Sequence, residues 1–155
     1  SEKSCRGSCY WIIDQHFKNP DKPLIEFAKE FEEGAPRDAI TMHKDCTIPA
    51  NLVERKVWEE WTAGAWPPMP QLDPGVYMFL IGYSENANTH GKAHLITLFK
   101  QEKPLLFDPD TGLSHWLDSD WTPLLERIGS DIRSSKAGYF TLECHSVEGV
   151  LQLPL

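Results

Sequence analysis

The spacing of apolar residues is helical in the first half of the chain and strand-like in the second. An apolar run that starts at Cys9, with Ser8 as N-cap and Asn19-Pro20 behind it, predicts a helix of about ten residues. A second helix is predicted from Pro23 to Gly34, and its apolar residues recur at helical spacing: Leu24, Phe27, Ala28 and Phe31. A third helix is predicted over residues 49–64, where Val53, Val57 and Trp61 share one face.

The remaining elements follow a segment rich in proline, residues 66–74, which favours an extended connector because proline cannot continue a helix. The apolar run over residues 76–83 predicts a buried strand. Further strands are predicted at residues 94–100, 105–108 and 139–147, with an edge strand at 150–155 and a helix at 118–135.

Helices followed by antiparallel strands predict an α+β fold. The length of 155 residues suits one domain with its own core. We therefore expect a single domain over residues 1–155, with a helical lobe at about 9–64, the connector at 66–74 and a sheet lobe at 75–155. The chain starts at Ser1 without Met, so we expect a domain of a longer protein.

The formal net charge of −8 argues against nucleic acid as a partner, because nucleic-acid binding needs a clustered basic face. It argues equally against an anionic membrane surface. No apolar run approaches the roughly 20 residues of a membrane-spanning helix. We expect a monomer that acts on another protein, without nucleic acid and without insertion into a membrane.

The four cysteines are Cys5, Cys9, Cys46 and Cys144. Cys5 and Cys9, together with Cys46 or Cys144, could supply the ligands of a zinc ion, but no second close pair accompanies the first. We therefore expect no metal and no cofactor. The predicted core is also large enough to need no disulfide.

Cys9 is the predicted nucleophile. The turn Gly7-Ser8-Cys9 places its sulfur at the start of the first predicted helix, where unpaired N–H groups favour the thiolate. The competing interpretation is a buried structural cysteine on a core helix. Cys5 is the other choice of nucleophile, but it lies before the predicted helix start.

His94 and Asp108 are predicted to face each other across a hairpin centred near Glu102. The two residues are nearly equidistant from that turn, so they should be directly or diagonally opposite. A carboxylate on one ring nitrogen would orient the histidine and leave the other nitrogen to accept a thiol proton. Packing of the Cys9 helix on this face would complete a Cys–His–Asp triad. His145 is the alternative base.

Three segments carry a resemblance to a known family: residues 7–12, 93–99 and 106–112. They combine a Gly-x-Cys helix start, a small-residue-His strand and a Phe-Asp-Pro-x-x-Gly turn. This order resembles the papain-like effectors of bacterial pathogens, above all the YopT-like cysteine peptidases, with the deamidases OspI and Pasteurella multocida toxin. The resemblance implies a papain-like fold in which Cys9 is the nucleophile, His94 the base and Asp108 the orienting acid.

The expected function is therefore a thiol hydrolase that acts on amide bonds of a target protein, as an effector or toxin that is secreted or delivered into a host cell and acts in its cytoplasm. Hydrolysis of a glutamine or asparagine side-chain amide is slightly preferred over peptide cleavage, because the spacing between Cys9 and His94 is shorter than in YopT-like peptidases. The alternatives are a YopT-like protease, a bacteriocin-leader-type peptidase, and a non-catalytic protein-binding module on the same scaffold.

Overall fold

The computed structural model describes residues 2–34, 47–63, 66–86, 91–116 and 138–150. Two helices come first, α1 (Glu2–Lys18) and α2 (Leu24–Glu32). Six strands follow: β1 (Leu52–Thr62), β2 (Gly75–Ser84), β3 (Lys92–Lys100), β4 (Leu105–Asp108), β5 (Gly112–His115) and β6 (Tyr139–Gly149). The α+β class is confirmed.

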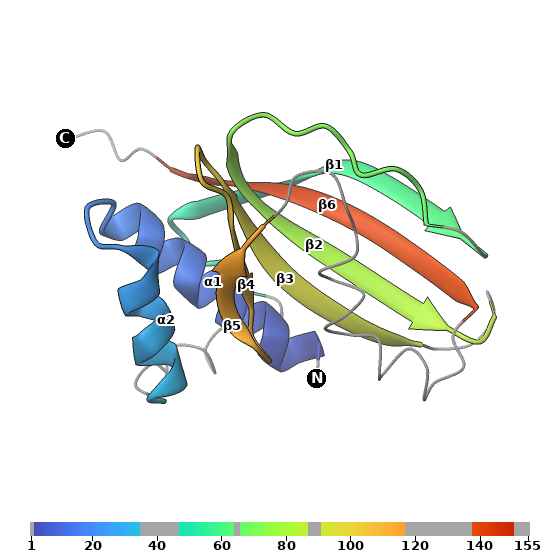
Figure 1. Ribbon diagram of the computed structural model, residues 1–155, viewed down its shortest axis with the longest axis horizontal. Coiled ribbons are helices and arrows are strands. Elements are labelled where there is room, and N and C mark those ends of the chain that lie inside the picture. The colour runs from blue at the N-terminus through green and yellow to red at the C-terminus, as the bar shows by residue number, and fades with distance from the viewer. Residues whose placement is uncertain (1, 35–46, 64–65, 87–90, 117–137, 151–155) are drawn as a thin grey trace.

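The strands form one antiparallel sheet in the order β1-β6-β2-β3-β4-β5. Figure 1 shows both helices together on one face of this twisted sheet, with α1 lying against β3. The predicted strands at 76–83, 94–100, 105–108 and 139–147 match β2, β3, β4 and β6, and the second predicted helix matches α2. The short strand β5 was not predicted.

The two faces of the sheet bury separate apolar clusters because side chains alternate along a strand. On the helical face, Ile12, Ile13 and Phe27 pack with strand residues such as Phe99 and Phe107. On the other face, the buried cluster includes Phe79, Ile81, Ile96, Leu106, Trp116 and Leu142. Trp66, Met69 and Leu72 of the proline-rich connector pack against this second cluster, so the connector covers part of the sheet.

The third predicted helix, residues 49–64, is wrong, because this segment forms strand β1 and pairs with β6. It therefore belongs to the sheet and not to a helical lobe. A β-bulge between Lys56 and Trp58 shifts the register. A bulge moves alternate residues from one face of a sheet to the other, so β1 lacks the two-residue period that reveals a strand.

The predicted start of the first helix is also wrong. Helix α1 already includes Glu2, so Ser8 is buried inside the helix and is not its N-cap. The apolar face of Ile12 and Ile13 extends toward the N-terminus through Cys9 to Cys5. Counted from Cys5 as i, these residues stand at i, i+4, i+7 and i+8. This continuous face, buried against the sheet, keeps the segment helical through Gly7. The predicted helix at 118–135 and the edge strand at 150–155 lie outside the described residues, apart from Val150.

Candidate functional site

The hairpin of β3 and β4 brings His94 and Asp108 together, as predicted. Phe107 pairs with Thr97, so Asp108 lies diagonally across from His94. His94 Nε2 lies 3.1 Å from Asp108 Oδ1, and both side chains are buried. The predicted contact is confirmed; a catalytic role for it stays a prediction.

The turn after β4 fixes the carboxylate of Asp108. Thr111 N–H donates to the Asp108 carbonyl, which closes a β-turn with Pro109 in its favoured second position. Asp110 N–H donates to Asp108 Oδ1 at 2.9 Å. Gly112 then takes a φ of 90°, a conformation that glycine adopts without strain. The sequence Asp-Pro-Asp-Thr-Gly therefore aims one carboxylate oxygen at His94.

The sulfur that faces His94 belongs to Cys5 and not to Cys9. Cys5 Sγ lies 3.8 Å from His94 Nδ1, within reach of a hydrogen bond to sulfur. The residue is 5% exposed and sits at the beginning of α1. The Cys5 sulfur thus contacts one nitrogen of the His94 ring, and the Asp108 carboxylate contacts the other.

Cys9 does not lie at a helix start, contrary to the prediction. It lies seven residues into α1, is 0% exposed and packs in the core with Ile12, Ile13 and Leu95. Burial raises the pKa of the Cys9 thiol, so the sulfur remains protonated at neutral pH. A neutral thiol enclosed in an apolar core has neither the charge nor the access that a nucleophile needs.

The surroundings of His94 favour its protonated form. Burial alone lowers the pKa of the ring, but the hydrogen bond to Asp108 and the contact with Cys5 outweigh burial and raise the pKa of His94 to about 10. An ionised carboxylate can only accept, so His94 Nε2 donates to Asp108. When the ring is neutral, Nδ1 therefore holds a lone pair that faces Cys5, and when the ring is charged, Nδ1 donates toward the sulfur.

A third polar side chain reaches the same ring nitrogen. Asp110 Oδ2 lies 3.7 Å from His94 Nδ1, and its side chain is 70% exposed at the rim of the site. Within the described part of the chain, one group of potential metal ligands is found, formed by Cys5, His94 and Asp110.

Of the two zinc ligand sets that the sequence offered, the one with Cys144 is not assembled. Cys144 is buried in the cluster on the opposite face of the sheet from Cys5 and Cys9, and all three are free cysteines. Cys46 lies outside the described residues.

His145, the alternative base, forms a separate pair. Its Nδ1 lies 2.6 Å from Glu54 Oε2, and Tyr10 donates a hydrogen bond to the other oxygen of Glu54. Arg6 in turn donates to the Tyr10 hydroxyl. This cluster connects α1 to β1 and β6, and no cysteine sulfur is among its described contacts, so it serves as the matched comparison for the site around His94.

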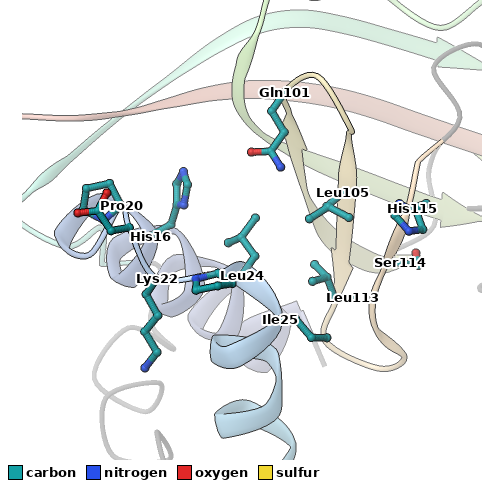
Figure 2. Close-up of a pocket in the computed structure, with 12 residues that line it drawn as sticks. His16, Pro20, Lys22, Leu24, Ile25, Gln101, Leu105, Leu113, Ser114 and His115 are labelled. Atoms are coloured by element: carbon teal, nitrogen blue, oxygen red, sulfur yellow. The ribbon is translucent and has the colours of Figure 1, made fainter.

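A cavity of about 520 Å³ lies away from this site. Figure 2 shows it between the corner that joins α1 to α2 and the strands β4 and β5, with His16, Leu24, Gln101 and Leu105 among its lining residues. His16 follows Cys5 by 11 residues on α1, a rise of roughly 16 Å. The cavity is therefore not where the sulfur and the histidine meet.

The sequence analysis ranked Cys5 below Cys9 as the nucleophile and assigned no role to Asp110. The signal for Cys5 was its i, i+4 relation to Cys9, which extends the apolar helical face upstream. The signal for Asp110 was its place in the same turn as Asp108, where the chain reverses beside His94.

Comparison of the chain with protein-family models, with curated proteins and with solved structures finds no match. Across the residues that the structure describes, no helix is both long enough and apolar enough to cross a bilayer. The class of the protein therefore rests on the α+β fold and on the geometry around His94.

Proposed function

We propose that the protein is a thiol hydrolase with a papain-like fold, in which Cys5 is the nucleophile, His94 the acid and base, and Asp108 the orienting carboxylate. One observation carries the proposal: Cys5 Sγ and Asp108 Oδ1 contact opposite nitrogens of the buried His94 ring. The proposal keeps the chemistry expected from the sequence and moves the nucleophile from Cys9 to Cys5.

The reaction follows from these contacts. The cycle starts when the Cys5–His94 pair has lost one proton: neutral His94 Nδ1 takes the proton of the Cys5 thiol, which gives the protonated ring that the site favours, and the thiolate attacks the carbonyl carbon of an amide. The imidazolium then protonates the leaving nitrogen, the C–N bond breaks, and a thioester remains on Cys5. Neutral His94 removes a proton from water, the hydroxide attacks the thioester carbon, and the C–S bond breaks. The released thiolate then takes back the proton held on His94, which restores the starting state.

Asp108 supports both halves of this cycle. It holds the Nε2–H tautomer, so Nδ1 is the nitrogen that exchanges protons with the sulfur. Its negative charge also stabilises the imidazolium that forms when the thiolate is generated. The Asp108 side chain is nearly inaccessible to solvent, which strengthens both effects because water screens the charge poorly there.

Burial of the Cys5 sulfur favours a slender substrate group. With 5% of the residue exposed and Asp110 at the rim, a carboxamide at the end of a glutamine or asparagine side chain fits the approach better than a backbone flanked by chain on both sides. We therefore propose side-chain deamidation of a target protein as the reaction and peptide cleavage as the alternative. An effector or toxin that acts in the cytoplasm of a host cell is the corresponding biological setting.

Selective alkylation tests the nucleophile. Iodoacetamide should modify Cys5 faster than Cys9 or Cys144, as located by peptide mapping, because only Cys5 faces a histidine that can remove its proton. His94→Ala should slow modification of Cys5, whereas His145→Ala, which breaks the comparison pair with Glu54, should not. Equal and slow modification of all three cysteines in the native chain would exclude the enzyme and leave a protein-binding module.

Mass spectrometry of incubated target proteins then separates the two reactions. Deamidation converts an amide to an acid at one residue and leaves the target chain intact, whereas proteolysis produces fragments. Cys5→Ser should abolish either product, and activity that persists in Cys5→Ser would contradict the proposed nucleophile.

A further inference from the structure

Three potential ligand atoms of different chemistry lie close together: a sulfur, a carboxylate oxygen and the Nδ1 nitrogen of His94. Cys5 Sγ lies 3.8 Å from Nδ1, Asp110 Oδ2 lies 3.7 Å from the same nitrogen, and all three atoms lie within 4.8 Å of one another. They come from α1, from β3 and from the turn that joins β4 to β5. Atoms that share one metal ion at bond lengths of about 2.0–2.3 Å are separated by roughly 3–4 Å, so little movement is needed to enclose an ion.

The other side of the ring is built as metal sites require. A histidine that binds a metal usually donates its second N–H to a carboxylate, which fixes the tautomer and the orientation of the ring. His94 Nε2 makes this contact with Asp108, 3.1 Å away, and the lone pair of neutral His94 is thereby directed to the side where Cys5 and Asp110 lie. The turn also holds the backbone of Asp110 in place, because its N–H donates to Asp108 Oδ1.

We propose that Cys5, His94 and Asp110 bind one Zn²⁺ ion and that the bound ion blocks the thiol of Cys5. Thiolate and imidazole ligands select zinc over Mg²⁺ and Ca²⁺, which prefer oxygen. Three protein ligands leave the fourth tetrahedral position to water. Zinc binding stands on the geometry alone, whereas its inhibitory consequence rests on the proposed hydrolase.

The inhibition follows because the metal site and the proposed triad use the same two atoms. Zinc would bind the sulfur lone pair that attacks a carbonyl. It would also bind the Nδ1 lone pair that accepts the thiol proton. A chain that holds zinc therefore has no free nucleophile and no free base at this site, and removal of zinc restores both. Asp110 belongs to the metal site and has no part in the proposed triad.

Calorimetric titration of the full chain with ZnCl₂ tests the site directly and needs no substrate. Asp110→Asn and Cys5→Ser should each weaken zinc binding by at least about ten-fold, and Asp108→Asn by about 10–100-fold through loss of the carboxylate behind the histidine. The control Asp21→Asn removes another exposed carboxylate, at the corner between α1 and α2, and should leave zinc affinity unchanged.

Alkylation provides the second readout. Zinc should protect Cys5 from iodoacetamide, and EDTA should remove the protection. Absence of zinc binding, or zinc affinity that is unchanged in both Asp110→Asn and Cys5→Ser, would overturn the proposal. Either result leaves the hydrolase to its own test, because selective alkylation of Cys5 in EDTA does not involve a metal.

Discussion

Replacement of Asp108 by Asn tests the electrostatics of the site, because it removes a negative charge and keeps the shape of the side chain. In the native chain burial opposes protonation of His94, but Asp108 and Cys5 outweigh burial and raise the pKa of His94 from 6.5 to about 10. At about 1.4 kcal/mol per pKa unit, this difference corresponds to a net stabilisation of the charged ring of about 5 kcal/mol, with the cost of burial already included. A hydrogen bond to a charged group contributes about 1.5–3 kcal/mol of such a total.

We therefore expect Asp108→Asn to lower the free energy of unfolding at pH 7 by about 1.5–3 kcal/mol. The sign of the pH dependence follows from linkage. The folded chain holds the His94 proton more tightly than the unfolded chain, so the stabilisation is complete below about pH 6.5 and is lost as the pH rises through about 10. The difference between native and variant proteins should shrink over the same interval.

Two measurements check this prediction. Urea denaturation from pH 6 to about pH 10 gives the free energy of unfolding, and NMR of the ring Cε1–H gives the titration of His94. Glu54→Gln is the control, because it alters the pair with His145 and should leave the titration of His94 unchanged. A native His94 that titrates near 6.5, or a titration that Asp108→Asn does not lower, would refute the reasoning.

Three further substitutions test the fold around the site. Cys9→Ala should leave the rate of Cys5 alkylation unchanged and cost about 0.5–3 kcal/mol in urea denaturation, because Cys9 fills the core; loss of Cys5 reactivity in a folded Cys9→Ala chain would contradict a purely structural role for Cys9. Phe107→Ala should cost about 3–5 kcal/mol in thermal denaturation, since the ring is fully buried between α2 and the sheet. Gly112→Ala should cost about 1–2 kcal/mol by urea denaturation because φ is 90° there, and a neutral result would show that the turn relaxes easily.

Local patterns were sufficient for much of the sheet and for the histidine pair. Strands that are buried on both faces can be recognised in the sequence as continuous apolar runs. This holds for β2, β3 and the short segment 105–108. The proximity of His94 and Asp108 followed from counting residues on either side of one turn. Such contacts are set by a single hairpin, so the sequence between the two residues contains most of what determines them.

The errors came from features that depend on distant parts of the chain. Strand β1 is stabilised by its pairing with β6, almost 90 residues later, and its bulge hides the strand period. Cys5 meets His94 because α1 docks along β3, and no local signal gives the position of a helix along a strand. The papain-like fold itself remains a prediction, since the described residues establish the α+β class alone.

The contacts of His94 with Asp108 and with Cys5 differ in sequence separation. Asp108 follows His94 by 14 residues, whereas Cys5 precedes it by 89. The short hairpin closes at low entropic cost, so we expect the histidine and the carboxylate to meet early in folding and the sulfur to join only when α1 docks. Any partial opening that releases α1 then exposes the fully buried Cys9 thiol while the hairpin persists. The oxidation rate of Cys9 in the resting protein is thus a measure of how often this helix leaves the sheet.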